Sequence, residues 1–446
     1  MSLPVPETWL AQLGEFLRIP SISADDAFAA DIAAAAEWVC GFVRAAGGTC
    51  ELVETRRHPL AVGEIPASEA FQKGRVPTVL VYGHFDVQPP GAEADWSSPP
   101  FEPAVRDGWL YGRGAADDKG NLFLLLKAVA SLAHEGALPV DVRIVCDGEE
   151  EVIGTSVVEF LEADERGADA CLIYDGTMPR RGLPFCFVGT RGLVYYHVTV
   201  TTGTRDLHSG FYGGAAMNAT HVLLELLSAV SSTPESLRVG AVSPTPEEVE
   251  AWAELDSGTA VLEGQGATPA DAGAAAEFYA RTLAAPAVDV NGLKGGEPDL
   301  QKTVLPVEAE ANVSIRLAPG QEVEEVAAVF ERLITDATPE GAKVHLTRRS
   351  SSPAGLVNTD AAPIRVALDA FEGVLGRRPI LVRCGGTLPI VPALVAKGVP
   401  VVHTGFDVPE GNVHAPDERL LLEYVPLGFE AARRTLVAFG DLAPSA

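Results

Sequence analysis

Three apolar runs, each ending in or followed by an imidazole or carboxylates, constrain the fold of this chain most. The runs are 79–87, 140–147 and 171–174, and helical patterns follow the first two. Buried strands that alternate with helices are typical of βαβ units, whose parallel strands share one sheet with helices packed on both faces. The sequence therefore predicts a doubly wound, mainly parallel α/β sheet, with its functional groups gathered at the carboxyl ends of the strands.

This α/β pattern is interrupted in the middle of the chain and resumes near its end. From about residue 189 the strands alternate between apolar and polar residues, and strand-helix-strand units replace the buried runs. At 446 residues the chain is long enough for two or three domains. We therefore expect a catalytic domain made of 1–188 and 351–446, interrupted by an inserted α+β sandwich at 189–350 that acts as a lid or dimerisation domain.

The composition is that of a globular protein with a strong acidic bias. Hydrophobic residues make up 47% of the chain, charged residues make up 21%, and the formal net charge is −28. Nucleic acids and anionic membranes bind basic surfaces, so this charge argues against both as partners. No stretch reaches the ~18 apolar residues of a membrane span, and the start does not look like a signal peptide. A cytoplasmic location is expected.

The six cysteines are scattered along the chain and contain no C-x-x-C pair. Cys146 and Cys171 lie within apolar strand-like runs. Buried, reduced thiols explain this distribution better than a disulfide framework or a structural zinc site.

The first apolar run ends in a pair of polar residues that suggests a metal site. If the strand stays extended, His84 and Asp86 point to the same side, because side chains alternate along a strand. A solvated strand end is the plainer interpretation of such a pair, so a metal site requires further ligands elsewhere. Mixed histidine and carboxylate ligands suit zinc, with cobalt or manganese as substitutes, and a shared carboxylate creates a two-metal hydrolytic site. The further candidates are Asp117, Glu149, Glu150, Glu151, Asp175 and His414.

Nine motifs in order along the chain carry a family resemblance. They are GHFDVQP, YGRGAADDKG, the GEEE run, the strand ending in Tyr174 and Asp175, DLHSGFYGG, KTVLP, SIRLAPGQ, GGTLP and GNVHAPDE. From about residue 80 to 420 the series resembles the di-zinc aminoacylase/carnosinase-type metallopeptidases, which include carboxypeptidase G, acetylornithine deacetylase and succinyl-diaminopimelate desuccinylase. Four of the motifs taken together are most similar to the carnosinase-like dipeptidase branch. These are GHFDVQP, DLHSGFYGG, KTVLP and SIRLAPGQ.

The resemblance implies two zinc ions per subunit. One ion would be held by His84, Asp117 and Asp175, and the other by Asp117, Glu151 and His414. Asp117 would therefore bridge the two ions.

Two further residues near the metals receive roles from the same resemblance. Asp86 would orient His84 through its second ring nitrogen, and Glu150 would act as the general base for a metal-bridging water. Family members commonly have one residue between the metal-binding glutamate and the following glycine. In this chain two residues, Val152 and Ile153, stand between Glu151 and the glycine. This leaves Glu149 and Glu150 as an alternative base and ligand pair.

The inserted domain contributes the remaining candidates. A surface loop histidine is the plain interpretation of His208, whereas the resemblance implies that it crosses a homodimer interface and helps to stabilise the oxyanion. Arg316, otherwise an ordinary strand arginine, would clamp the substrate carboxylate. Thr303, Gly386 and Thr387 would add a hydroxyl and backbone amides at the same substrate terminus.

The resemblance as a whole implies a dimeric two-zinc amidohydrolase that cleaves dipeptides or short peptides. The main alternative keeps the chemistry but uses N-acyl amino acids as substrates, as acetylornithine deacetylase does. A non-catalytic binding homologue is a more remote alternative, because it predicts missing ligands and every expected position is filled.

Overall fold

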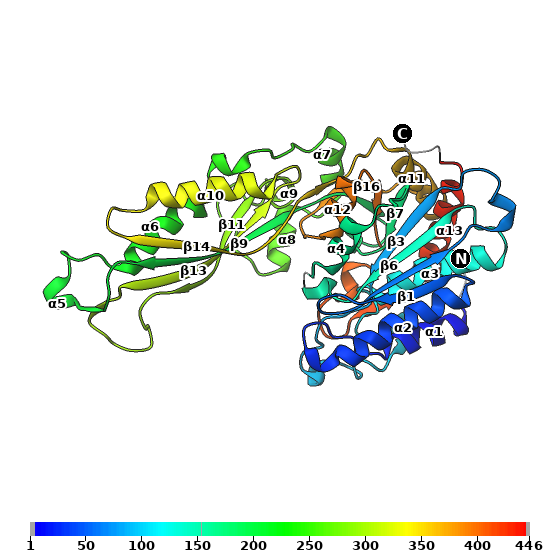
Figure 1. Ribbon diagram of the computed structural model, residues 1–446, viewed down its shortest axis with the longest axis horizontal. Helices are drawn as coiled ribbons and strands as arrows, with labels where there is room; N and C mark the ends of the chain where they lie inside the picture. Colours follow the sequence, from blue (N-terminus) through cyan, green and yellow to red (C-terminus); the bar gives the residue numbers. More distant parts are fainter. Residues whose placement is uncertain (1–4, 153, 443–446) are drawn as a thin grey trace. The chain divides into compact units, whose positions relative to one another are not determined.

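The computed structural model describes residues 5–152 and 154–442, which divide into two compact units (Figure 1). Unit 1 contains the chain up to Val188, then Val357–Val382, and the chain from Ala393. Unit 2 contains Gly189–Leu356 and Arg383–Pro392. The chain therefore passes between the units four times.

This division differs in two places from the boundaries expected from the sequence. Unit 2 begins at residue 189, as expected, but it extends to Leu356 rather than to residue 350. The segment Arg383–Pro392 also belongs to unit 2. Arg383 there is buried and pairs with Glu248 at 2.6 Å, which fixes this segment within unit 2.

Unit 1 is built on a mixed sheet with a parallel centre. Its strands are β1 (Thr49–Val53), β2 (Leu60–Ile65), β3 (Thr78–His84), β6 (Asp141–Asp147), β7 (Ala170–Ile173), β8 (Phe185–Thr190), β16 (Ile380–Cys384) and β17 (Val401–His403). The order is β1-β2-β6-β3-β7-β17-β8, and β16 also pairs with β8. Strands β6, β3, β7 and β17 are parallel, whereas β1, β2 and β8 pair antiparallel. The predicted mainly parallel α/β sheet is confirmed.

Helices cover the sheet of unit 1 on both faces. They are α1 (Glu7–Leu17), α2 (Ala29–Ala45), α3 (Lys119–His134), α4 (Ser156–Ala163), α11 (Ala362–Leu375), α12 (Ile390–Ala396) and α13 (Val425–Phe439). The crossover through α3 leads from β3 to β6, and the crossover through α4 leads back past β3 to β7. Because such crossovers are right-handed, α3 and α4 lie on opposite faces, and the strand order reverses around β3. Ligands of such sheets bind at this reversal, beyond the carboxyl ends of the strands.

The proline-rich segment that follows β3 contains short elements as well as loops. It includes β4 (Ala104–Arg106), which forms a three-stranded sheet with β5 (Trp109–Tyr111) and β18 (Arg419–Leu421). Strand β3 itself ends at His84. Asp86 therefore lies in the loop, and strand alternation does not decide which way it points.

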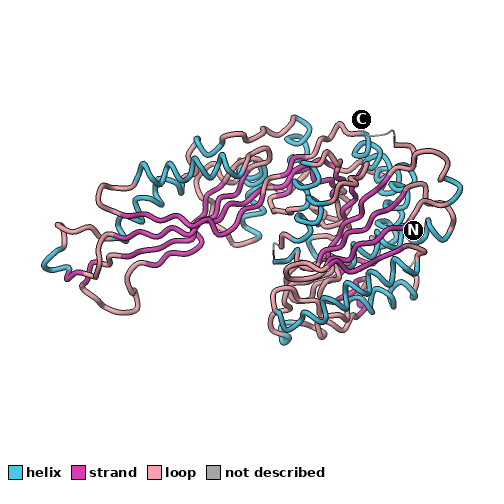
Figure 2. The backbone as a smooth tube through the Cα atoms, in the orientation of Figure 1, coloured by secondary structure: helices cyan, strands magenta, loops and turns pink. Residues whose placement is uncertain are grey.

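Unit 2 has its own antiparallel sheet with two helices on one face (Figure 2). The sheet strands, in order, are β11 (Ala287–Lys294), β13 (Glu308–Leu317), β9 (Gly192–Thr201) and β14 (Lys343–Ser352). Helices α6 (Ala219–Ser231) and α10 (Val323–Ala337) bury the apolar side chains of this sheet. The other elements of unit 2 are β10 (Leu207–His208), α5 (Ser209–Tyr212), α7 (Pro246–Trp252), α8 (Gly258–Gly264), α9 (Phe278–Leu283), β12 (Val304–Leu305) and β15 (Gly355–Leu356).

The cysteine prediction was wrong for one pair. Cys40 of α2 and Cys50 of β1 form a disulfide across the turn that joins these elements. The turn contains two glycines, and this close return brings the two thiols together. Cys146, Cys171 and Cys186 are buried, as expected. Within the described residues, no helix is long and apolar enough to cross a membrane.

Candidate functional site

The carboxyl ends of β3, β6 and β7 bring the predicted metal ligands of unit 1 together. His84 is the last residue of β3 and pairs in register with Asp147 of β6. Gly83 permits this packing, because a Cβ atom there would lie 2.7 Å from the Asp118 carboxylate and 3.0 Å from Leu122 of α3. The absence of a side chain at Gly83 therefore lets the start of α3 approach the end of β3.

The potential ligand atoms form two groups of three that share Asp117. One group contains His84, Asp117 and Asp175, the other contains Asp117, Glu151 and His414, and within each group the atoms lie within 4.8 Å of one another. Asp117 Oδ1 lies 3.0 Å from His84 Nε2, and Asp117 Oδ2 lies 3.0 Å from His414 Nε2. The two oxygens of one carboxylate thus face two different groups, as a bridging ligand requires.

The acidic run at 149–151 turns its three side chains in different directions. Glu151 Oε2 lies 3.1 Å from His414 Nε2, and Glu150 Oε2 lies 4.0 Å from His84 Nε2. Glu149 is buried, and its carboxylate accepts a hydrogen bond from the Ser156 amide at 3.3 Å. This geometry favours Glu151 as the ligand and Glu150 as the base over the alternative register.

Asp86 contacts both the histidine and the acidic run. His84 Nδ1 lies 3.1 Å from the Asp86 carbonyl oxygen and 3.4 Å from its carboxylate. The two carboxylate oxygens of Asp86 accept hydrogen bonds from the amides of Glu150 (3.3 Å) and Glu151 (3.1 Å). The expected orientation of His84 therefore involves the Asp86 backbone, while the Asp86 carboxylate holds the turn that presents the two glutamates.

Protonated imidazoles are strongly favoured in this cluster. Burial lowers the pKa of His84, but hydrogen bonds to Asp117 and Asp86 outweigh burial and raise that pKa well above its usual value. Hydrogen bonds to Asp117 and Glu151 raise the pKa of His414 to about 10. Burial opposes ionisation of Asp117, yet the two imidazoles hold its pKa below the usual range.

Asp175 and Glu150 are hard to ionise without a further positive charge. Burial, together with the carboxylates of Asp117 and Asp86, raises the pKa of Asp175 to about 7, although His84 opposes the shift. Burial also raises the pKa of Glu150 well above its usual value, again against the influence of His84. Nearby like charges add to the effect of burial in both cases.

This donor set fits divalent cations. In the described part of the chain, the ion pairs that these carboxylates form within 4.0 Å are with His84 and His414. Buried like charges of this kind are stable when cations compensate them, and histidine with carboxylate oxygen is a ligand set that suits zinc, manganese or cobalt. Cations would also replace the protons that the cluster otherwise retains.

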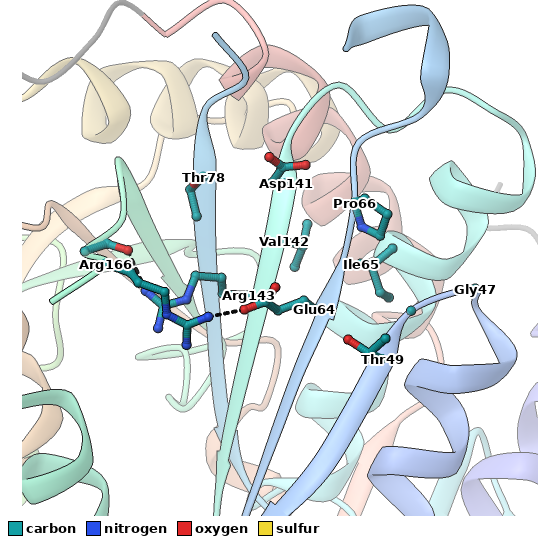
Figure 3. Close-up of a pocket in the computed structure, with 12 residues that line it drawn as sticks. Gly47, Thr49, Glu64, Ile65, Pro66, Thr78, Asp141, Val142, Arg143 and Arg166 are labelled. Carbon is teal, nitrogen blue, oxygen red and sulfur yellow. Dashed lines mark hydrogen bonds and ion pairs between the residues drawn. The ribbon is translucent and has the colours of Figure 1, made fainter. Parts of the chain in front are cut away.

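A cavity elsewhere in unit 1 has no histidine among its lining residues and so lacks this ligand set (Figure 3). It has a volume of about 540 Å³ and is lined by Thr78 and Asp141, which begin β3 and β6. It therefore lies at the end of the sheet opposite His84. Its arginines, Arg143 and Arg166, both form ion pairs with Asp164. We place no functional site there.

The candidates of unit 2 form two separate groups. His208 of β10 lies beside Thr303, whose carbonyl oxygen accepts hydrogen bonds from the Ser209 amide and hydroxyl, both at 2.9 Å. Arg316 donates a hydrogen bond to the Thr387 hydroxyl at 3.0 Å. The Gly386 carbonyl oxygen accepts a hydrogen bond from the Arg191 amide. Within a single subunit, Thr303 therefore lies beside His208 rather than with Arg316 and Thr387, contrary to the grouping expected from the sequence.

Further residues support the centre, and among them Glu418 and His403 were not predicted from the sequence. Asp118 accepts a hydrogen bond from the His84 amide at 3.2 Å, and the imidazole of His403 lies 2.5 Å from the Asp175 carbonyl oxygen. Glu418 binds the segment that precedes Asp117. Glu418 stands in a motif that carries a predicted ligand, so its position alone could have indicated it. His403 had no such signal.

Comparisons with known proteins define the class of this chain. The model of Peptidase family M20/M25/M40 matches residues 80–438, so the chain belongs to this family and is a metal-dependent peptidase. The cysteinylglycine-S-conjugate dipeptidase of Corynebacterium striatum is 27% identical over 402 residues, covering 86% of this chain and 85% of that protein. The beta-Ala-His dipeptidase of Homo sapiens is 29% identical over 362 residues, covering 77% of this chain and 71% of that protein.

A solved structure supports the fold. The M20 family metallo-carboxypeptidase Sso-CP2 from Sulfolobus solfataricus aligns with a TM-score of 0.82 at 23% identity, over 97% of this chain and 99% of that chain. The family resemblance carried by the nine motifs is confirmed, and so is the similarity to the carnosinase-like branch.

Proposed function

We propose that the protein is a cytoplasmic, homodimeric dipeptidase that binds two zinc ions per subunit, with manganese or cobalt as substitutes. The observation that carries this proposal is the Asp117 carboxylate, whose two oxygens each lie 3.0 Å from a histidine of a different ligand group. Both relatives described above are named as dipeptidases, and this supports a dipeptide as the substrate.

In this proposal the protein side chains perform the proton transfers. When bound, the two cations polarise the scissile carbonyl and lower the pKa of the attacking water. Glu150 takes a proton from that water and later gives it to the leaving amine, so its carboxylate is regenerated in each turnover. Asp86 holds Glu150 in place through the Glu150 amide.

Arg316 is the proposed binding group for the substrate carboxylate. Its guanidinium is oriented by the Thr387 hydroxyl, which in turn donates to the carbonyl of residue 191 at 2.7 Å. A planar guanidinium with a fixed partner suits bidentate binding of a carboxylate. Gly386 and Thr387 would contribute backbone amides to the same substrate terminus.

His208 and Thr303 are proposed to act on the substrate bound to a partner subunit. Arg316 lies eight residues along β13 from Glu308, where the chain arrives from Thr303. This separation is roughly 25 Å, far longer than a dipeptide. His208 Nδ1 accepts a hydrogen bond from the Gly210 amide at 3.0 Å, so the neutral imidazole carries its proton on Nε2, where it could stabilise an oxyanion.

A substrate panel together with a matched pair of variants tests the proposal. The zinc- or manganese-loaded protein should hydrolyse dipeptides faster than N-acetyl amino acids. Glu150→Gln should retain both cations and lose a factor of about 10² to 10⁴ in kcat, because the general base is absent. Glu149→Gln is the control and should stay within a few-fold of wild type, since Glu149 faces Ser156.

Two outcomes would contradict the proposal in different ways. Faster turnover of N-acetyl amino acids than of any dipeptide would favour the N-acyl amino acid deacylase instead. A fully active, zinc-loaded Glu150→Gln variant would remove Glu150 from the mechanism.

A further inference from the structure

Glu418 is a fully buried carboxylate that no part of the proposed reaction uses. It lies four residues after His414, and its oxygens accept four hydrogen bonds. Oε2 accepts from the Arg113 guanidinium at 2.6 Å and from the Gly114 amide at 3.0 Å. Oε1 accepts from the amides of Ala116 at 2.9 Å and Asp117 at 3.1 Å.

All four donors belong to one short segment, 113–117, which ends in the bridging carboxylate. Gly114 has a φ of +83°, and a Cβ atom there would lie 2.8 Å from Val87, so the segment is both curved and tightly packed. Three of its amides converge on a single carboxylate. Hydrogen bonds to a buried charge are strong, and loss of the acceptor leaves their donors unsatisfied. Glu418 therefore fixes the backbone that presents Asp117.

The backbone of Glu418, which lies in the loop that carries His414, is also held by hydrogen bonds. Its carbonyl oxygen accepts a hydrogen bond from the Gly112 amide at 2.9 Å, and the next residue begins β18, which pairs with β5. His414 and Asp417 both have positive φ, at 61° and 59°, so a compact turn joins His414 to Glu418. One residue thus links the loop that carries Asp117 to the loop that carries His414.

The two ligand groups differ in how much they depend on such a link. The side chain of His84 is fully buried at the end of β3, whereas 51% of the His414 side chain is exposed. The neighbours of His84 hold it in place, while His414 depends on the conformation of its loop. A change in the distance between the Asp117 and His414 loops would therefore affect the group of Asp117, Glu151 and His414 most.

We propose that Glu418 is a positioning residue that sets the spacing of Asp117 and His414 and thereby determines the affinity of the second cation position. The first position, which contains His84 and Asp175, would be less affected. This inference rests on the proposed two-cation function. It assigns Glu418 no contact with the substrate or with the cations.

The test compares Glu418→Gln with a control that has similar chemistry elsewhere in unit 1. Asp169 is also buried and accepts hydrogen bonds from Arg75 and from the Thr78 amide, at the start of β3 rather than at its end. Asp169→Asn should therefore lower stability without changing cation binding. Glu418→Asp keeps the charge but shortens the side chain, and it should fall between wild type and Glu418→Gln.

Zinc stoichiometry and affinity provide the first readout, measured by native mass spectrometry and by competition with a chelator. Wild type and Asp169→Asn should bind two ions. Glu418→Gln should bind the first ion with nearly unchanged affinity and the second with an affinity lowered about 10- to 100-fold, the range typical of residues that orient metal ligands. Equal affinities of wild type and Glu418→Gln for both ions would overturn the inference.

Hydrogen exchange in the metal-free proteins provides the second readout. The amides of Gly114, Ala116 and Asp117 should exchange at least tenfold faster in Glu418→Gln than in Asp169→Asn. Unchanged exchange would show that Glu418 does not hold the segment. If wild type binds fewer than two ions, the two-cation function itself fails, and amide exchange still decides whether Glu418 positions Asp117.

Discussion

Single residues show that the candidate centre depends on close packing as well as on ligands. The Asp118 carboxylate accepts a hydrogen bond from the His84 amide at 3.2 Å, and Leu122 of α3 packs beside it. Both contacts require a glycine at position 83. A residue without chemistry of its own therefore affects the position of a predicted metal ligand.

Gly83→Ala should destabilise the protein by about 1–3 kcal/mol, because the added methyl group overpacks a site with no room for it. It should also weaken zinc binding by displacing His84 or Asp118. Gly41→Ala is the control, since nothing lies within 4 Å of a Cβ atom there and the residue is inside α2. Alanine at that position should be neutral or slightly stabilising. Urea denaturation of the metal-free proteins and zinc titration measure both effects.

A Gly83→Ala protein with the stability and zinc affinity of wild type would show that the start of α3 can move away from β3. In that case the close approach would not position His84.

Whole elements were more predictable from the sequence than the contacts between them. Apolar and polar residues alternate over 192–201, which indicates β9 to the residue, and the helical spacing of apolar residues over 362–375 indicates α11. Local periodicity was sufficient in both cases. The disulfide and the two-residue strands β10 and β12 could not be predicted, because they depend on segments that meet only in the folded chain. The two ligand groups were predicted from family motifs. The hydrogen bonds that the Asp86 carboxylate accepts from the Glu150 and Glu151 amides could not be predicted, because they depend on the folded turn.

The end of α4 contains a cluster of charges that links several elements. Asp164 follows α4 and pairs with Arg143 of β6 and with Arg166, which also pairs with Glu64 of β2. Burial alone would raise the pKa of Asp164, but the two guanidinium groups outweigh it and lower that pKa below its usual value.

The lowered pKa predicts how the stability contribution of Asp164 varies with pH. A carboxylate with a depressed folded pKa stabilises the fold fully above its unfolded pKa of about 3.9, and this contribution is lost as the pH falls through the folded pKa. Asp164→Asn should cost about 1–2 kcal/mol at pH 7, and the difference from wild type should shrink below about pH 4. Urea midpoints between pH 3 and pH 7 measure this dependence.

Asp26→Asn is the control for this prediction, because the Asp26 side chain is 91% exposed. Its effect should be small at every pH. A stability difference for Asp164→Asn that stays constant down to pH 3 would contradict the linkage.

The whole molecule requires a partner if His208 acts as proposed. Near His208, a hollow of about 750 Å³ in unit 2 is lined by charged and polar residues together with three exposed apolar side chains, Leu293 (52% exposed), Leu300 (56%) and Val304 (38%). Val304 of β12 pairs directly with His208 of β10. Exposed apolar groups that cluster in this way are typical of interfaces. The net charge of −28 would oppose association of two copies, so the dimer should be more stable at higher salt.

Leu293→Glu should weaken the dimer and lower kcat, while the zinc content of each subunit stays unchanged. A carboxylate in an apolar interface is costly to bury, and a monomer lacks the partner's His208. Val437→Glu on α13 is the control, because Val437 is similarly exposed (49%) but lies in unit 1. Sedimentation velocity, turnover and metal analysis on the same samples separate these effects. Full activity of monomeric protein at nanomolar concentration would contradict a catalytic role for His208 across the interface.

The four passages of the chain between units 1 and 2 limit how the protein can be recombined. A fragment that ends at Leu356 lacks Arg383, so the buried Glu248 loses the partner that lies 2.6 Å away. An unpaired buried carboxylate would destabilise such a fragment strongly. Unit 2 therefore cannot be exchanged between relatives as one continuous cassette. A functional chimera must transplant 383–392 from the same parent as 189–356.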